Sequence, residues 1–163
     1  MGAFASRILW GMDDQDILAV NVQLSDKAKL PLLGTKGAAG YDLSASEDGT
    51  LLSGVPTKIP TGVRLEMPAF LVAFVRGRSG LASKGIRVFE GTIDSDYRGE
   101  VSVLVTNDTA SDFKVSAGHR IAQIVFLPIA RPDLVKVQEL GKTNRGEGGF
   151  GSTGVAISES RNA

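Results

Sequence analysis

The chain has 163 residues, enough for one domain or one domain with arms, and can bury a core without disulfides. Lysine plus arginine equal aspartate plus glutamate, 18 against 18, which disfavours the basic stripe of a protein that binds nucleic acid nonspecifically. The chain has no cysteine, which excludes thiol nucleophiles and zinc–thiolate sites, and one histidine, His119, which excludes a multi-histidine metal site within one chain. Any metal is therefore expected to be a hard cation such as Mg²⁺, bound by oxygen.

Residues 1–18 are predicted to form an N-terminal arm, with weak helical periodicity over 7–18. The arm has no charged region followed by a long apolar core, so it does not read as a secretory signal, and no apolar run in the chain reaches the roughly 18 residues of a membrane span. The start MGAFAS matches the short N-myristoylation pattern, which acts only in a eukaryotic cell. We therefore expect an intracellular, soluble protein of the cytoplasm or nucleus, without membrane contact unless Gly2 is myristoylated.

The stretch from 19 to 130 has the apolar pattern of many short strands. Three of its segments alternate apolar with polar residues, and two are denser apolar runs typical of strands buried on both faces. In chain order the segments are residues 20–24, 63–67, 70–75 (dense), 101–105 and 121–127 (dense). Glycine-containing turns separate them, and residues 79–84 show one short helical turn. The pattern predicts one all-β domain over 19–130, a sandwich or a barrel.

Residues 131–163 are predicted to be a C-terminal arm, which leaves the β domain through the extended segment LPIARP at 127–132. Residues 141–154 hold six of the twenty glycines and only Phe150 as an apolar side chain, so they contribute little to a core. Composition alone allows a disordered segment. A cation, an aromatic ring, hydroxyls and free amides together also suit a lid that closes on a phosphorylated aromatic ligand.

Five segments resemble, in order and with near-family spacing, the motifs of the trimeric dUTPase family. They are AAGYDL at 38–43, GRSGLA at 77–82, GTIDSDYRGEV at 91–101, GHRIAQ at 118–123 and RGEGGFGSTG at 145–154. The resemblance implies a jelly-roll-like β-barrel with a flexible glycine-rich arm, and hydrolysis of dUTP to dUMP and pyrophosphate with Mg²⁺. It also implies a homotrimer in which each active site draws on all three chains, the C-terminal arm completing a neighbour's site.

Asp94 is the implied general base. It lies in a segment that reads as a turn between strands, where aspartates commonly accept backbone hydrogen bonds. An aspartate is ordinarily ionised at neutral pH and can hold and deprotonate a water molecule. The resemblance implies that Asp94 aims this water at the α-phosphorus of dUTP, opposite the departing pyrophosphate.

The resemblance also implies a uracil and deoxyribose pocket around the same segment. The Tyr97 ring would lie under the sugar, where a 2′-hydroxyl would clash, and Ile93 would flank the sugar. The hairpin that begins at Gly91 and Thr92 would hydrogen-bond the uracil edge with main-chain groups, which glycine allows a ligand to approach closely. Cytosine would leave those groups unpaired.

Phosphate contacts are implied for Arg78, Ser79, Gly80 and Gln123. Arg78 can donate two hydrogen bonds to phosphate oxygens, and the Ser79 hydroxyl with nearby amides can bind the α–β bridging region. Asp42 is expected to accept a hydrogen bond from the water shell of Mg²⁺. The alternatives from the residues alone are a surface turn at 78–80, a satisfied core amide at Gln123 and a strand-end cap at Asp42.

In the arm, Arg145 would pair with the γ-phosphate and Phe150 would stack on uracil, while Gly151, Ser152 and Thr153 would donate to the terminal phosphates. This loop lacks the lysine of a GxxxxGK[ST] phosphate loop and opens no helix, which disfavours a P-loop NTPase.

Two features depart from the family pattern. His119 stands where many relatives have an acidic residue, and the spacing from Arg78 to Asp94 is shorter by about one residue, which leaves the main-chain uracil contacts open. Two other functions remain possible on the same fold: a dCTP deaminase, disfavoured by the intact IDSDY and GGFGSTG segments, and a noncatalytic interaction module derived from a dUTPase.

Overall fold

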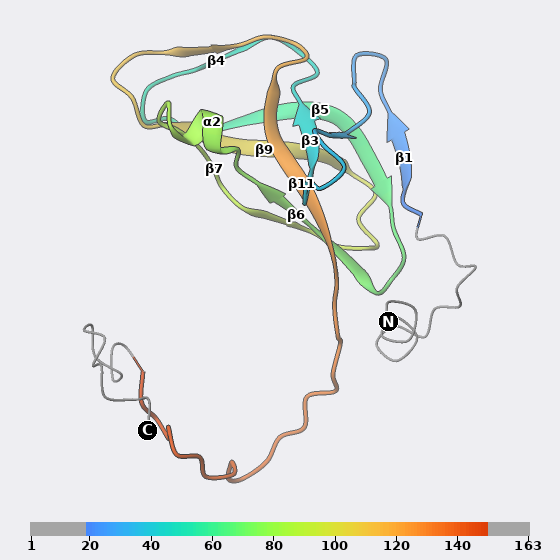
Figure 1. The fold of residues 1–163 in the computed structure, drawn as a ribbon, viewed down its shortest axis with the longest axis vertical. Helices are drawn as coiled ribbons and strands as arrows, with labels where there is room; N and C mark the ends of the chain where they lie inside the picture. Colours follow the sequence, from blue (N-terminus) through green and yellow to red (C-terminus); the bar gives the residue numbers. More distant parts are fainter. Residues whose placement is uncertain (1–18, 150–163) are drawn as a thin grey trace. The chain divides into compact units, whose positions relative to one another are not determined.

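Short strands form nearly all the regular structure that the computed structural model describes, which covers residues 19–149. The chain divides into two units, residues 1–130 and 131–163. The elements of the first unit follow in chain order (Figure 1): β1 (Asn21–Leu24), β2 (Leu32–Leu33), β3 (Tyr41–Ser44), β4 (Gly49–Leu51), β5 (Thr57–Glu66), β6 (Leu71–Arg76), α2 (Ser79–Ala82), β7 (Ile86–Val88), β8 (Gly91–Ile93), β9 (Glu100–Asn107), β10 (Phe113–Val115) and β11 (Arg120–Pro128). The predicted all-β class is confirmed.

The strands make two larger sheets and one small pair. One sheet has the order β1-β5-β9-β7, the other has the order β2-β3-β11-β6-β8, and β10 pairs with β4. Consecutive strands often belong to different sheets, so most pairings join distant parts of the chain, as in Greek-key and jelly-roll folds. Every pairing between these strands is antiparallel.

The core lies between the two larger sheets and takes side chains from both. Val63, Val101 and Val103 of the first sheet are fully buried, as are Leu43 and Ala73 of the second. All belong to one continuous apolar cluster, so the sheets pack face to face. The alternation predicted for 63–67 and 101–105 therefore marks the inward face of these strands.

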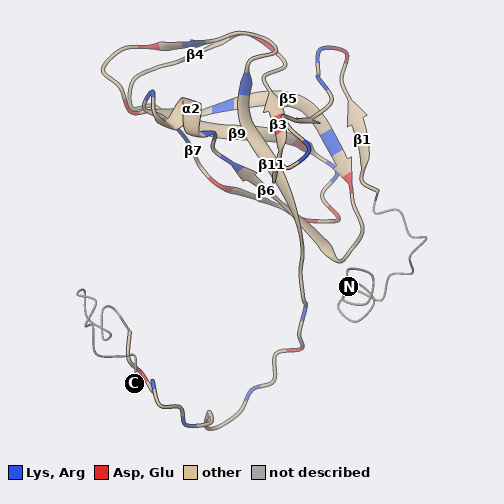
Figure 2. Cartoon of the chain, viewed as in Figure 1, with Lys and Arg blue, Asp and Glu red and all other residues tan. Residues whose placement is uncertain are grey.

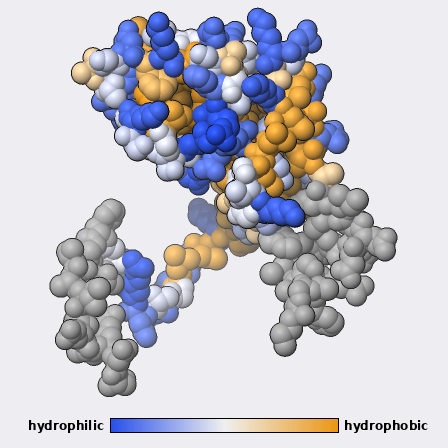
Figure 3. All heavy atoms as spheres, turned by 45° about the horizontal axis from the view of Figure 1, so that its top comes forward, coloured by the Kyte–Doolittle hydropathy of each residue, from blue (hydrophilic) through white to orange (hydrophobic). Residues whose placement is uncertain are grey.

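Apolar side chains are also exposed on both units (Figure 3). On the first unit they include Leu30, Leu32 and Leu33 around β2. In the second unit, Leu134 is 95% exposed and Leu140 81% exposed. Residues 131–149 contain bends and turns but no strand or helix. In the described part of the chain, no helix has the length and apolar content needed to cross a membrane.

Candidate active site

Strand pairing brings three of the motif segments together at one end of β11. β3 and β6 are the two neighbours of β11, and Gln123 of β11 lies opposite Asp42 of β3 on one side and Arg76 of β6 on the other. Arg78 comes two residues after the end of β6 and is the residue before α2. The register along β11 shifts between Arg120 and Ala122, a bulge of the kind that re-aims a side chain.

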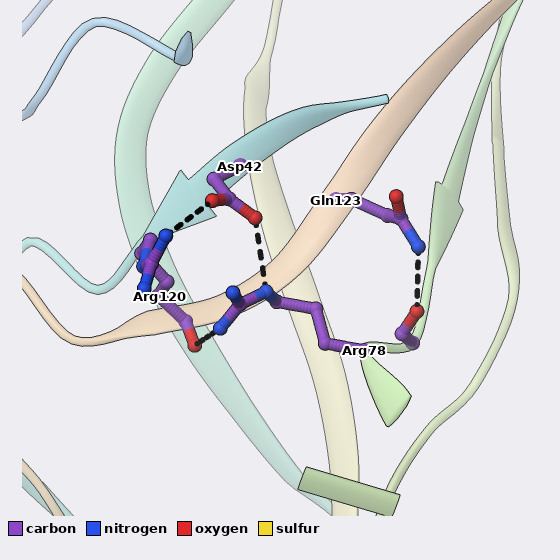
Figure 4. Close-up of polar contacts among 5 residues, drawn as sticks. Asp42, Arg78, Arg120 and Gln123 are labelled. Atoms are coloured by element: carbon purple, nitrogen blue, oxygen red, sulfur yellow. Dashed lines mark hydrogen bonds and ion pairs between the residues drawn. The ribbon is translucent and has the colours of Figure 1, made fainter. Parts of the chain in front are cut away.

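Asp42 is the centre of this cluster (Figure 4). One carboxylate oxygen, Oδ1, accepts from Nε of Arg78 at 2.9 Å, and the other, Oδ2, accepts from Nη1 of Arg120 at 3.0 Å. Arg78 also donates from Nη1 to the main-chain carbonyl of Arg120 at 3.1 Å. The Asp42 side chain is 17% exposed and that of Arg78 28%, while the Arg120 side chain is 58% exposed, so Asp42 lies on the inner side of the cluster and Arg120 on its solvent side.

Gln123 lies beside this cluster, and its orientation depends on two glycines. Its Nε2 donates to the carbonyl of Gly77 at 3.0 Å. On its other side is Gly40, where an added Cβ would lie 2.8 Å from Gln123 Oε1 and 3.2 Å from the carbonyl of Ile124. The missing side chain of Gly40 therefore leaves the room that the Gln123 amide occupies.

Ser79 and Gly80 form the first half of α2 and are exposed. A Cβ added to Gly80 would meet nothing within 4 Å, so the fold itself does not require glycine there. Both residues are open to a ligand beside Arg78.

The second predicted group lies on β8 and in the turn after it. Gly91, Thr92 and Ile93 form β8, and Asp94 is exposed directly after the strand, where its carbonyl accepts from the main-chain N–H of Tyr97 at 3.1 Å. The Tyr97 hydroxyl donates to the carbonyl of Glu100 at 3.2 Å. A Cβ on Gly99 would overlap the Tyr97 ring, so the ring rests on this glycine.

Within one chain, Asp94 and Arg78 lie towards opposite ends of β6. Ile93 pairs with Ala73, so Asp94 is next to residue 72, and Arg78 is six positions further along the chain, two residues beyond the end of β6. At about 3.3 Å per residue, this places them roughly 20 Å apart. A base that acts through one water must lie within hydrogen-bond reach of that water, with the water about 3–3.5 Å from the reacting atom. The main chain of one subunit therefore holds these two residues well apart.

Arg145 of the second unit lies in a tight turn of its own. Its Nε donates to the carbonyl of Gly148 at 2.8 Å, and the Gly148 N–H donates back to the Arg145 carbonyl at 3.0 Å. Gly146 in this turn has φ +51°, in the left-handed region that glycine adopts without strain. The other predicted lid residues, Phe150, Gly151, Ser152 and Thr153, lie outside the described residues, as do Gly2 and the rest of the N-terminal arm.

The donor chemistry of the cluster suits a metal ion held mainly by a ligand and water. Over residues 19–149, acidic residues are spread along the chain (Figure 2), and no three His, Cys, Asp or Glu residues gather closely enough to hold a metal. Asp42 brings one carboxylate, and both of its oxygens already contact arginines. Mg²⁺ often binds through one or two carboxylates and takes its other ligands from phosphates and water, which fits this set.

The sequence prediction did not include Arg120, Gly40 or Gly77, which all contact the predicted residues. All three lie inside the motif segments 38–43, 77–82 and 118–123, so their position in the sequence is a usable signal. Their contacts depend on which strands pair with β11, and no local pattern in the sequence gives that pairing.

Comparisons with known proteins agree on one family. A family model described as dUTPase matches residues 26–154. The chain is 52% identical over 138 residues to a deoxyuridine 5′-triphosphate nucleotidohydrolase of Desulfitobacterium hafniense, which covers 80% of this chain and 91% of that protein.

Two solved phage structures share the fold. One is a mutant dUTPase of Staphylococcus bacteriophage 80alpha bound to dUpNHpp. It matches with a TM-score of 0.81 and 29% sequence identity, and the match covers 84% of this chain and 99% of the phage protein chain. The other is a mutant dUTPase of phage phi11 of S. aureus that coordinates a structural Mg(II) ion. It matches with a TM-score of 0.73 and 25% sequence identity, and the match covers 76% of this chain and 99% of the phage protein chain.

Proposed function

The chain belongs to the dUTPase family, and on that premise we propose which of its residues carry out its reaction. That reaction is the hydrolysis of dUTP to dUMP and pyrophosphate, so the protein is a dUTP diphosphatase. These relatives favour the diphosphatase over a dCTP deaminase of the same fold.

Asp94 acts as the general base. Its carboxylate accepts a proton from a water molecule whose oxygen forms a new bond to the α-phosphorus. The bond between that phosphorus and the α–β bridging oxygen breaks, and the electron pair leaves with pyrophosphate. The exposure of Asp94, at the end of β8, supports this role because a base must reach both water and substrate.

Arg78, Ser79, Gly80 and Gln123 bind the triphosphate. Arg78 stabilises negative charge on the leaving pyrophosphate, which is the main electrostatic demand of phosphoryl transfer. The hydroxyl of Ser79 and the open main chain at Gly80 lie next to Arg78 and are exposed, which supports a shared phosphate contact.

Gly91, Thr92, Ile93 and Tyr97 form the pocket for uracil and deoxyribose. β8 is an edge strand of its sheet, so its outer main-chain groups are available to the uracil edge. The Tyr97 ring, fixed against Gly99 and by its hydroxyl, offers a rigid surface for the sugar, which supports exclusion of a 2′-hydroxyl.

Each site is shared between subunits of a homotrimer. The observation that carries this proposal is the separation of Asp94 from Arg78 by six residue positions along β6 and the two residues after it, roughly 20 Å of chain. Because base and phosphate ligands must meet at one substrate, the base of one chain has to serve phosphates bound by another. The arm, with Arg145 and the segment 150–153, completes the site of a neighbouring chain as a lid over uracil and the terminal phosphates.

Mg²⁺ is the proposed cofactor, as the structural Mg(II) ion of the phi11 enzyme supports for the family. Bound to the triphosphate, it would neutralise part of the phosphate charge. Asp42 is the candidate to accept a hydrogen bond from its water shell. An intracellular location, in the cytoplasm or nucleus, stays a prediction.

The substitution Asp94→Asn tests the base. The variant keeps the size of the side chain but loses proton acceptance, so we expect dUTP turnover to fall by about 10²- to 10⁴-fold. Binding of dUpNHpp should stay close to that of the parent. Asp96→Asn, two residues away, is the matched control and should keep most turnover. Comparable turnover in the Asp94→Asn variant and the parent would rule out the assignment.

A further inference from the structure

Asp42 is engaged by two arginines that are far apart in the sequence, Arg78 just before α2 and Arg120 at the start of β11. Each carboxylate oxygen accepts from one of them, Oδ1 from Arg78 and Oδ2 from Arg120, at 2.9 and 3.0 Å (Figure 4). The main chain of Asp42 is itself fixed, because it pairs with Leu32 on one side and Gln123 on the other. Asp42 is therefore a rigid acceptor that sets where both guanidinium groups lie.

Arg78 is held at two points of its planar group. Nε contacts Asp42, and Nη1 donates to the Arg120 carbonyl. These contacts use two of the five N–H groups of the guanidinium and leave the others for a ligand. A long side chain that is already oriented loses less conformational freedom when phosphate binds, so affinity and turnover gain from the pre-organisation.

The charges of the cluster allow two effects of Asp42 on phosphate binding to be told apart: its own negative charge and its positioning of Arg78. Arg78 and Arg120 are like charges that share one carboxylate, and together the three groups have a net charge of +1. Removing the negative charge of Asp42 would raise the positive charge beside a phosphate ligand, which by itself favours anion binding. It would also release Arg78 and let the two arginines repel each other, which disfavours binding.

We propose that Asp42 and Arg120 are positioning residues that hold Arg78 in its phosphate-binding orientation. The inference rests on the proposed function of Arg78 in binding the triphosphate. It assigns Arg120 to the site and gives Asp42 a role that does not pass through the metal ion.

The test measures binding of dUpNHpp and of dUMP, and dUTP kinetics across a Mg²⁺ titration. For Asp42→Asn we expect roughly tenfold weaker dUpNHpp binding, the scale of one charge-assisted hydrogen bond, with dUMP binding nearly unchanged. The same loss should appear when Mg²⁺ is withheld, because the contacts of Asp42 with Arg78 and Arg120 involve no metal ion. A loss seen only in the presence of Mg²⁺ would show that Asp42 acts through the metal alone, and tighter dUpNHpp binding would show that only its charge matters; either overturns the proposal.

Arg120 provides a second, independent variant, because its side chain is 58% exposed and its loss is tolerated more easily by the fold. Arg120→Met should weaken dUpNHpp binding in the same direction as Asp42→Asn, and Arg120→Lys should restore part of the loss. Glu47→Gln removes an exposed carboxylate from the connection after β3 and is the control for loss of one negative charge. Its binding and kinetics should equal those of the parent. Unchanged dUpNHpp binding in Arg120→Met overturns the role of Arg120.

A double-mutant cycle separates this inference from the proposed function. Arg78→Ala should weaken dUpNHpp binding, and adding Asp42→Asn should cost little more, because the residue that Asp42 positions is already gone. If Arg78→Ala alone has no effect, the proposed role of Arg78 fails. If Arg78→Ala is severe but the Asp42→Asn loss adds to it in full, Arg78 keeps its role and only the positioning by Asp42 is wrong.

Discussion

At the scale of single residues, Gly40 shows how a missing side chain can define a site. A methyl group there would lie 2.8 Å from Gln123 Oε1 and 3.0 Å from Val125 Cγ2. Since Gly40 is buried, the methyl group cannot turn towards solvent. The proposed phosphate ligand Gln123 therefore depends on a neighbour that touches no substrate.

Gly40→Ala should displace the Gln123 amide and destabilise the fold by about 1–3 kcal/mol, the usual cost of overpacking. We expect the KM for dUTP to rise several-fold, with thermal unfolding and steady-state kinetics as the measurements. Gly37→Ala, three residues earlier, is the control because nothing lies within 4 Å of its added Cβ. Equal KM values for the two variants would contradict the dependence of Gln123 on Gly40.

Tyr97 allows a prediction about sugar discrimination. Tyr97→Ala removes the ring that rests on Gly99, so we expect the preference for dUTP over UTP to fall by about tenfold or more in kcat/KM. Tyr97→Phe keeps the ring and loses only the hydrogen bond to the Glu100 carbonyl, so it should retain most of the preference. An unchanged dUTP-to-UTP ratio in Tyr97→Ala would place the sugar elsewhere.

The residues of the site could be predicted only in part from the sequence. Asp42, Arg78 and Gln123 were named through the family motifs, and they do lie together in the structure. Their mutual contacts were not foreseen, because Asp42 and Arg78 are far apart in the chain and meet only through β11. Arg120 looked like an ordinary surface arginine until that pairing joined its side chain to Asp42.

At the scale of elements, hydrophobic alternation predicted strands well where both neighbours of the strand are present. Val101, Val103 and Val105 are all buried, and β9 is an inner strand of its sheet. The alternation over residues 20–24 likewise predicts that Leu24 faces the core, but this residue is 39% exposed. β1 is an edge strand that pairs with β5 alone. A period of two gives the face of a strand but not its place in the sheet.

The C-terminal arm is the element whose removal should separate folding from catalysis. Residues 131–149 form no strand or helix and add no member to the buried core. Deleting residues 145–163 should therefore leave the melting temperature near that of the full chain and abolish efficient dUTP hydrolysis. Deleting only residues 155–163, which follow the fifth motif segment and match no family motif, should preserve turnover. Normal hydrolysis by the longer deletion would remove the lid from the mechanism.

At the scale of the whole molecule, the proposed sharing of sites predicts complementation between inactive chains. Asp94→Asn and Arg78→Ala, each inactive alone, should form mixed trimers in which some sites combine an intact Asp94 with an intact Arg78 from another chain. Random mixing gives about a quarter of the parent activity, because each of the two residues is intact with a probability of one half. Activity of co-refolded mixtures is the measurement.

Arg78→Ala mixed with Gln123→Ala is the control for complementation. Both residues belong to the cluster around β11 of one chain, so mixing leaves every site with one defect and should restore nothing. If the Asp94→Asn and Arg78→Ala mixture also stays inactive while mixed trimers form, base and phosphate ligands do not come from different chains.

The separation of Asp94 from Arg78 within one chain has a consequence for when dUTP hydrolysis begins after synthesis. If roughly 20 Å of chain, β6 and the two residues after it, keeps base and phosphate ligands apart in each subunit, a newly made chain can be fully folded and still inert. Hydrolysis would start only after chains encounter one another, so its onset would rise more steeply than the amount of protein synthesised. Dilution would then silence the enzyme without unfolding it.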